Sequence, residues 1–278
     1  FSVTYPFHFH RNMVVSVNYQ RLYDFKRNFS HLYDYSSAGL DLEQNKHFSQ
    51  DGTLGALGLA GAVQITPKIS LGATFNIWTD ELGWENGWGE NYSEHGVGTQ
   101  GGVPVTIDTR IEDQYSNFRG INANFGLLWY VNAYLTIGAV VKTPFTAEIK
   151  HEFSYEQTQT YGAPVDDTST THQQFKEDVE LDMPLSYGIG LAWRFSDAFS
   201  MDLDVYRTNW SEYMLTDDQG NEFSPIDGRS KSQSNVEDTT QLRIGAEYLY
   251  IMQDKNMVIP VRAGLFYDPE PSEGAPED

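Results

Sequence analysis

The stretch from Ile69 to Trp78 limits the possible folds more than any other part of the chain. Every second residue from Ile69 to Ile77 is apolar or small, and the residues between them are polar or glycine. This period of two is typical of a β-strand with one apolar and one polar face. Its length of about ten residues is roughly what a tilted strand needs to cross a bilayer.

The same unit recurs along the chain. Short turns follow one another at about 55 to 65 residues, and each interval reads as a strand, a long polar loop and a second strand. The loops are expected around residues 28–50, 79–112 and 155–175. The turns are Arg11–Asn12, Thr66–Lys68, Asn132–Ala133, Ser196–Ala198 and Gln253–Asn256. Such regularity predicts an all-β, antiparallel up-and-down β-barrel with short turns at one end and long loops at the other.

We expect ten strands from this alternation. They cover residues 1–7, 13–20, 55–65, 69–78, 121–131, 135–142, 185–194, 199–206, 242–248 and 261–265. Phe1 opens inside a strand and Asp278 ends in a polar loop, so we interpret residues 1–278 as an interior piece of a longer protein.

Composition narrows the class of protein. The mean hydropathy of −0.48 and a charged fraction of 21% suit a chain whose polar faces and loops offset its apolar faces. No apolar run reaches the length of a membrane helix. The absence of cysteine excludes thiol catalysis and cysteine-ligated metal clusters. A net charge of −21 argues against nucleic acid as a partner.

Two features favour lipid over a soluble core. Aromatic residues gather beside the short turns, as in an interfacial girdle, and include Trp129, Tyr130, Tyr134, Trp193, Phe195 and Phe199. The faces opposite the apolar ones are polar in nearly every strand, which suits a wet or plugged lumen. The alternative is a large soluble antiparallel barrel or sandwich with one solvated face.

Several longer strings are more specific than the alternation. They are RNMVVSVNYQRLYDF (11–25), QITPKISLGATFNIWTD (64–80), LDMPLSYG (181–188), DVYRT (204–208) and GLFYDPEP (264–271). Together they resemble the FadL/TodX family of outer-membrane transporters, and the resemblance covers essentially the whole chain. It implies uptake of hydrophobic compounds, such as long-chain fatty acids or aromatic hydrocarbons, across the bacterial outer membrane, without catalysis or a cofactor.

The resemblance also implies an architecture. Members of the family have a barrel of fourteen strands plugged by an N-terminal hatch. The ten strands expected here would be the second to the eleventh, so residues 1–278 would be part of one transmembrane domain. The hatch, the first strand and the last strands would lie outside it. We expect a monomer in contact with outer-membrane lipid and lipopolysaccharide. The alternative function is a general diffusion porin for small hydrophilic solutes.

Candidate capture residues lie in the expected loop 79–112, which the resemblance makes a landing surface for substrate. Leu82, Trp84, Trp88 and Tyr92 provide the apolar area that binds an acyl chain or a hydrocarbon ring. The competing interpretation is that these side chains pack the loop onto itself or anchor it at the outer leaflet.

Candidate charged residues lie on the polar faces. Arg194 could pair with Asp202 across the ladder, and Arg243 could form a cluster with Glu247 and Arg262. Such clusters would brace the lumen or bind the hatch. The alternative is that Arg194, Arg243 or Arg262 contacts a substrate carboxylate.

Other chemistry has little support. None of the seven histidines has a spacing with serine or aspartate that indicates a hydrolase. His8 and His10 alone do not make a metal site. The acidic residues Asp217, Asp218, Glu222 and Asp227 either keep a loop soluble or bridge to lipopolysaccharide through divalent cations.

A lateral exit for substrate is implied by the resemblance, at a kink in the strand that matches Met13–Phe25. Alternation in this strand fails at Arg21, which would otherwise face lipid. We therefore expect an irregularity there and a gap to a neighbouring strand. The alternative is a regular strand from which Arg21 reaches the interface.

Overall fold

The protein is built from long antiparallel strands, seen in a computed structural model that describes residues 1–81, 83 and 85–272. Two short 3-10 turns, η1 (Trp210–Glu212) and η2 (Gln253–Lys255), interrupt them. No helix in these residues is long and apolar enough to cross a membrane. The strands are β1 (Ser2–Phe9), β2 (Arg11–Ser37), β3 (Leu40–Thr66), β4 (Ile69–Trp78), β5 (Gly87–Gln100), β6 (Val103–Tyr130), β7 (Leu135–Lys142), β8 (Phe145–Tyr161), β9 (Asp167–Met183), β10 (Ser186–Arg194), β11 (Phe199–Thr208), β12 (Met214–Thr216), β13 (Glu222–Phe223), β14 (Thr239–Met252) and β15 (Met257–Tyr267).

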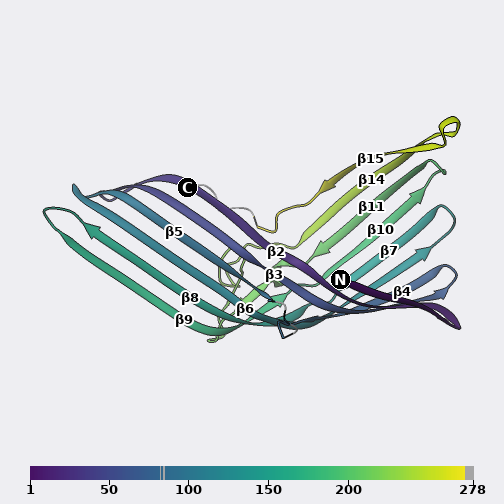
Figure 1. The fold of residues 1–278 in the computed structure, drawn as a ribbon, viewed down its shortest axis with the longest axis horizontal. Coiled ribbons are helices and arrows are strands. Elements are labelled where there is room, and N and C mark those ends of the chain that lie inside the picture. Colours follow the sequence, from purple (N-terminus) through teal and green to yellow (C-terminus); the bar gives the residue numbers. More distant parts are fainter. Residues whose placement is uncertain (82, 84, 273–278) are drawn as a thin grey trace.

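The ten predicted strands form one continuous sheet, which we call the wall sheet. Its order is β1-β2-β3-β4-β6-β7-β10-β11-β14-β15, and β1 and β15 are its edges in the described residues. Only the halves of β2, β3 and β6 next to the short turns belong to it (Figure 1). The predicted strand order and antiparallel pairing are confirmed.

The two faces of the wall sheet differ as the alternation predicts. Leu71 pairs with Leu127, and Leu203 lies between Leu191 and Ile244. Leu71, Phe75, Ile137, Leu191, Leu203 and Ile244 share this apolar face by register. Asn76, Asn124, Asp204 and Arg243 share the other face, which we call the inner face. The prediction of two separate faces is confirmed.

The long polar segments are not loops, and that prediction was wrong. Residues 28–50, 79–112 and 155–175 fall largely within β2, β3, β5, β6, β8 and β9. Their hairpins pair side by side into a branch of the same 15-stranded sheet, which we call the wing sheet and which continues through β12 to β13 (Figure 1). The physical reason is that β-pairing satisfies backbone groups whatever the side chains, so threonine- and glutamine-rich segments still form strands.

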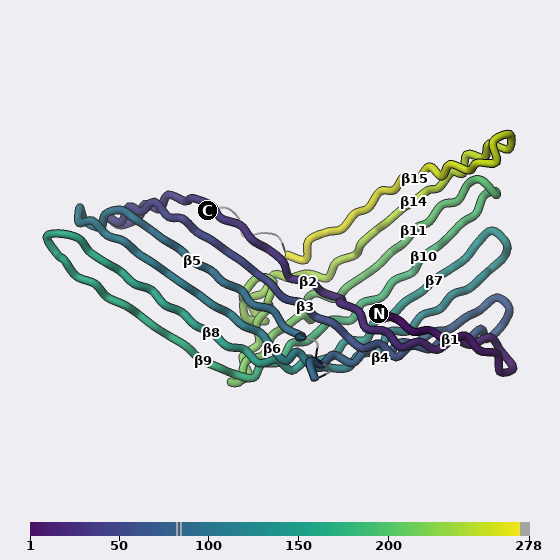
Figure 2. Tube along the Cα trace, in the orientation of Figure 1, coloured from purple at the N-terminus to yellow at the C-terminus, as the bar shows by residue number. Residues whose placement is uncertain are grey.

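The two sheets meet at a hydrophobic core. β2, β3 and β6 run without a break from one sheet into the other, and the sheets diverge from this junction (Figure 2). The buried members of the core are Leu54, Ala56, Trp78, Phe118, Ala147, Ile149, Val179, Leu181 and Leu215. Phe118 is 0% exposed and Ile149 is 2% exposed.

Asn86 joins the two sheets where β3 changes its neighbour from β5 to β4. Its amide accepts the Gly55 N–H at 2.7 Å and donates to the Gly55 carbonyl at 2.8 Å. Its own carbonyl accepts the Phe118 N–H at 3.0 Å. The side chain of Asn86 therefore replaces a missing strand at Gly55, where an unpaired buried backbone group would be costly.

Two irregularities turn side chains onto the inner face at this junction. The β2–β3 register shifts between Arg21 and Tyr23, so Tyr23 faces inward and stacks on Trp78 at 6.2 Å. The β6–β8 register shifts between Ser116 and Arg119, with Asn117 at a φ of 57°. One extra residue reverses the alternation of everything beyond it. The predicted irregularity beside Arg21 is confirmed.

Candidate functional site

A row of aromatic rings crosses the inner face of the wing sheet. Phe25 on β2 lies 5.1 Å from Trp88 on β5, between ring centroids. Trp88 lies 4.5 Å from Tyr115 on β6, and Tyr115 lies 4.5 Å from His151 on β8. We call these four side chains the aromatic ladder. They come together because the two register shifts place Phe25 and Tyr115 on the same face as Trp88.

Gly52 makes the first contact of the ladder geometrically possible. It is the residue of β3 that lies between Phe25 and Trp88 in the register. A Cβ atom on Gly52 would come within 2.4 Å of the Gly87 carbonyl oxygen and of Trp88 Cα. Its φ of 147° is also in a region that other residues rarely adopt. Only glycine lets the rings of the two outer strands meet across β3.

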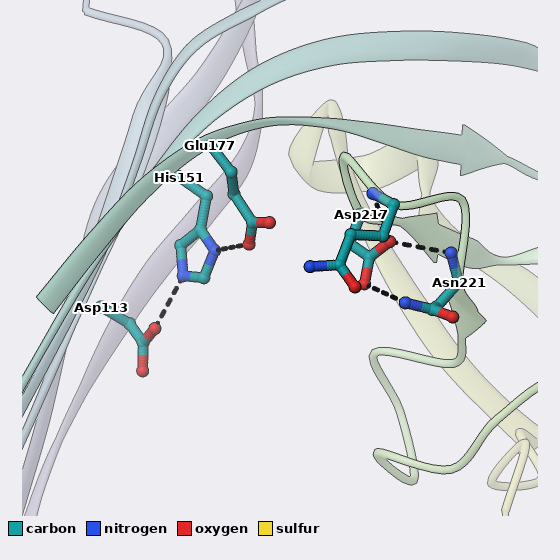
Figure 3. Close-up of polar contacts among 6 residues, drawn as sticks. Asp113, His151, Glu177, Asp217 and Asn221 are labelled. Carbon is teal, nitrogen blue, oxygen red and sulfur yellow. Dashed lines mark hydrogen bonds and ion pairs between the residues drawn. The ribbon is translucent and has the colours of Figure 1, made fainter. Parts of the chain in front are cut away.

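His151 ends the ladder and is held by two carboxylates. Its Nε2 lies 2.8 Å from Asp113 Oδ1, and its Nδ1 lies 3.0 Å from Glu177 Oε1 (Figure 3). Burial lowers the pKa of His151, but the hydrogen bonds to Asp113 and Glu177 outweigh that effect, so the pKa is raised. The imidazole ring stacks in parallel on Tyr115.

The predicted capture residues have different outcomes. Leu82 and Trp84 lie outside the described residues. Trp88 is half-buried, belongs to the aromatic ladder and packs against the core, while its Nε1 donates to Glu90 at 3.2 Å. Tyr92 lies on the same face of β5, and its hydroxyl donates to Glu94 at 2.6 Å. Burial and the Glu94 carboxylate raise the pKa of Tyr92. Trp88 thus combines the expected packing role with a partly open ring.

More exposed aromatic rings flank the ladder on the inner face. Phe153 on β8 and Phe175 on β9 stack at 4.9 Å, and Phe175 is 45% exposed. Phe29 and Phe48 meet at 5.3 Å in the same row as Tyr92. Apolar rings that remain accessible beside a fixed aromatic row form a surface suited to apolar ligands.

A second candidate site lies on the inner face of the wall sheet. A cavity of about 500 Å³ is lined by Lys142, Asp204, Tyr206, Gln241 and Arg243 over a floor that includes Gly138, Gly188 and Gly190. Lys142 Nζ lies 5.6 Å from the centroid of the Tyr206 ring. Arg243 is opposite Asp204 in the register and donates to Gln241 Oε1 at 2.9 Å. Two cations beside one carboxylate can bind an anionic group.

The expected pairing of the arginines was largely wrong. Ser200, not Asp202, lies opposite Arg194, and Asp202 is opposite Ala192 because the turn between β10 and β11 sets the register. Arg243 faces Asp204 instead of joining Glu247. Only the pair between Arg262 and Glu247 forms, at 2.5 Å. The structure therefore places Arg243 in the cavity and leaves Arg194 and Arg262 near the short turns.

The acidic loop before β14 is held by its own carboxylates. Asp217 accepts the N–H group of Gln219 at 2.9 Å. It also accepts the N–H group of Asn221 at 2.8 Å (Figure 3). Hydrogen bonds from the side chain and backbone of Asn221 lower the pKa of Asp217. Asp227 accepts the N–H of Arg229 at 3.0 Å in the same way. In the described residues no group of three or more histidines or carboxylates is arranged to hold a metal.

Sequence reasoning missed His151, Asp113, Phe175 and Lys142 as site residues. The period-two alternation of Val103, Val105 and Ile107 in the supposed loop was the available signal for a strand there. It would have placed Ile111, Asp113 and Tyr115 on one face.

Residues 34–277 match the family model described as Outer membrane protein transport protein (OMPP1/FadL/TodX). A search of the curated proteins gave no match.

Three solved structures are similar in arrangement. The CymD monoaromatic hydrocarbon channel is 16% identical over 93% of this chain and 68% of its own, with a TM-score of 0.42. The Pseudomonas putida toluene transporter TodX is 13% identical over 96% of this chain and 67% of its own, with a TM-score of 0.44. A Pseudomonas aeruginosa FadL homologue is 13% identical over the whole chain and 61% of its own, with a TM-score of 0.48. The chain spans about two thirds of the length of these proteins.

Proposed function

We propose that this chain, which belongs to the OMPP1/FadL/TodX family of outer-membrane transport proteins, takes up hydrophobic compounds through the bacterial outer membrane. Residues 1–278 form part of one transmembrane β-barrel domain whose wall sheet crosses the bilayer. The substrates are long-chain fatty acids or aromatic hydrocarbons. The protein acts as a monomer in contact with lipid and lipopolysaccharide.

Capture begins at the aromatic ladder, and this is the observation that carries the proposal. Trp88 presents a partly open indole, Tyr92 lies four residues further along the same face of β5, and Phe153 and Phe175 extend the apolar surface. All of these rings face the same side as the lumenal residues of the wall sheet, because β3 runs between the two sheets without changing its alternation. A compound bound at the wing sheet therefore lies on the same face as the lumenal residues.

The cavity on the wall sheet receives the substrate next. Its glycine floor leaves room for an apolar chain or ring, and Lys142 and Arg243 can hold a carboxylate if the substrate carries one. Arg194 and Arg262 lie closer to the short turns and act later on this route. The wing sheet and the cavity thus divide the task between apolar capture and lumenal binding.

Release to the side occurs at the bulge between Arg21 and Tyr23. The shift in the β2–β3 register is a local break in an otherwise continuous ladder. A gap from β2 to a neighbouring strand remains a prediction. Paired cysteines introduced across that gap should block uptake when oxidised and leave substrate binding unchanged.

Uptake of labelled toluene and oleate by cells that produce the protein tests the proposal. Trp88→Ala should lower the initial rate between about two- and tenfold, since an aromatic contact contributes roughly 0.5–1.5 kcal/mol. Trp193→Ala is the matched control, because Trp193 is the same side chain on the apolar face of the wall sheet, where it is 51% exposed. Equal rates for both variants would contradict capture at the ladder.

Conductance distinguishes this function from that of a porin. A transporter with a plugged lumen should give little steady ion current when the complete protein is reconstituted in planar bilayers. A large and stable open-channel current would favour diffusion of hydrophilic solutes instead.

A further inference from the structure

His151 connects three strands of the wing sheet through one ring. The residue is 8% exposed and lies on β8, while its two carboxylate partners come from β6 and β9. A neutral imidazole has one N–H and can donate to only one carboxylate. Both ring nitrogens lie within hydrogen-bond distance of carboxylate oxygens, at 2.8 Å and 3.0 Å. The arrangement therefore fits the imidazolium form and no neutral tautomer.

The charge of His151 matters because acidic groups surround its ring. Asp113 from β6 and Glu177 from β9 face it directly, with side chains that are 25% and 16% exposed. Glu90 from β5 and the phenols of Tyr115 and Tyr213 are further titratable groups on this side. Without the proton, Asp113 and Glu177 would face each other across a neutral ring, and one of them would lose its donor.

The same ring positions the flanking aromatic surface. His151 meets Phe175 edge to face at 5.5 Å and stacks on Tyr115 with only 2° between the ring planes. Glu177 lies two residues from Phe175 on β9, so the ion pair fixes the part of the hairpin that carries this exposed ring. Movement of β9 away from β6 would open the aromatic surface beside Trp88.

We propose that His151 is a proton-dependent latch that ties the β8–β9 hairpin to β6 and thereby sets the affinity of the aromatic ladder for hydrophobic compounds. This regulation rests on the proposed capture function. His151 is a positioning residue, because it acts through Phe175 and Tyr115 rather than through a charge on the substrate. In the protonated state the ladder is complete, and in the neutral state the ring keeps only one of its two hydrogen bonds, to Asp113 of β6 or to Glu177 of β9.

The sign of the pH dependence follows from the environment. The pKa of His151 in the folded protein is raised above its ordinary value of 6.5. The stabilising contribution of the latch is therefore fully present below about pH 6.5 and is lost as the pH rises through the higher folded value. Capture should weaken toward alkaline pH.

Two measurements on the complete protein in lipid nanodiscs test the latch between pH 5 and pH 10. The first is hydrogen exchange of the β8–β9 amides, corrected for the intrinsic effect of pH on exchange. The second is binding of 4-bromotoluene, followed by quenching of Trp88 fluorescence, with Trp88→Phe as the background for quenching of the other tryptophans. The variants are His151→Gln, which cannot titrate, and His172→Gln on the opposite face of the same hairpin.

We expect wild type and His172→Gln to lose protection of β8–β9 and about tenfold in affinity across the transition, equivalent to about 1.4 kcal/mol. His151→Gln should show a flat profile at the weaker level. Protection of β8–β9 in wild type that does not change with pH would overturn the latch, and this holds even if His151→Gln fails to fold. Absence of 4-bromotoluene binding at every pH, with exchange that still follows pH, would contradict the capture function and leave the latch in place.

Discussion

The wall sheet and the wing sheet use the same period-two alternation and treat their apolar side chains in opposite ways. In the wall sheet the apolar face is open, and Phe75 is 53% and Leu203 is 41% exposed. In the wing sheet, Ile149 and Val179 are each 2% exposed under the core at the junction. Alternation thus defines a face, and the surroundings decide whether lipid or protein covers it.

The difference has a thermodynamic consequence. On a face covered by lipid, fluid acyl chains adapt to side chains of different shape, so such substitutions cost little stability. A charged side chain on that face is costly. A protein-covered core is packed closely and loses free energy when a cavity is opened. Substitutions in the two sheets should therefore destabilise the protein for different reasons. Three substitutions test this difference.

The largest effect is expected from Phe118→Ala in the core at the junction. Phe118 is 0% exposed and meets Trp78 and Phe145 edge to face at 5.4 Å and 6.2 Å. Truncating a buried phenylalanine costs about 3–5 kcal/mol. Hydrogen exchange should rise sharply in the wing sheet and much less in β10, β11 and β14 of the wall sheet.

The matched control is Phe29→Ala, which removes the same side chain from an exposed position of the wing sheet, where Phe29 is 51% exposed. Its effect on exchange should be small. Equal loss of protection in both sheets with Phe118→Ala would show that they unfold as one unit, and the comparison would fail.

A smaller loss is expected from Leu203→Arg on the apolar face of β11. An arginine on the lipid side costs about 2–4 kcal/mol near the bilayer midplane. Gly245→Arg is the control, because its side chain would lie on the inner face opposite Asp202 and a Cβ there meets no atom within 4 Å. Urea unfolding from vesicles measures both. If Gly245→Arg is as destabilised as Leu203→Arg, the apolar face of the wall sheet does not face lipid.

The sequence predicts the strands of the wall sheet much better than those of the wing sheet. The strands of the wall sheet, their order and both faces follow from the alternation, because one face is apolar from end to end. The wing sheet was misread as loops, since segments such as Asp167–Gln174 carry almost no apolar residue. Their strands form because a neighbouring hairpin supplies hydrogen-bond partners, a tertiary effect that side-chain pattern does not encode.

The sites show the same limit. Trp88 was identified as an aromatic residue of a segment that the family resemblance makes a landing surface. Its ladder depends on two extra residues, one near Leu22 and one at Asn117, that reverse the alternation. Arg21 marked the first because a charged residue broke the pattern. Nothing comparable marks the second, and His151 therefore could not be placed beside Tyr115.

The smallest effect is expected at Asp238, where the segment that carries the core residue Leu215 returns to the wall sheet. Burial raises the pKa of Asp238, but hydrogen bonds from Ser211 and the charge of Arg207, 2.9 Å away, lower it overall. The carboxylate therefore stabilises this attachment above about pH 3.8, and the contribution is lost as the pH falls through the lower folded value.

Asp238→Asn should accordingly speed hydrogen exchange of residues 209–238 at neutral pH, by a loss of up to about 1 kcal/mol for a half-exposed ion pair. The difference from wild type should vanish in strong acid. Glu237→Gln makes the same change of charge one residue away, where the backbone N–H donates to Pro271 at 2.7 Å and the side chain is exposed, so it should leave exchange unchanged. Equal effects of both variants would mean that net charge, and not the bonds of Asp238, holds this segment to the wall sheet. The segment would then be held by the buried Met214 and Leu215 and by the pairing of β12 with β9, as the rest of the wing sheet depends on the core.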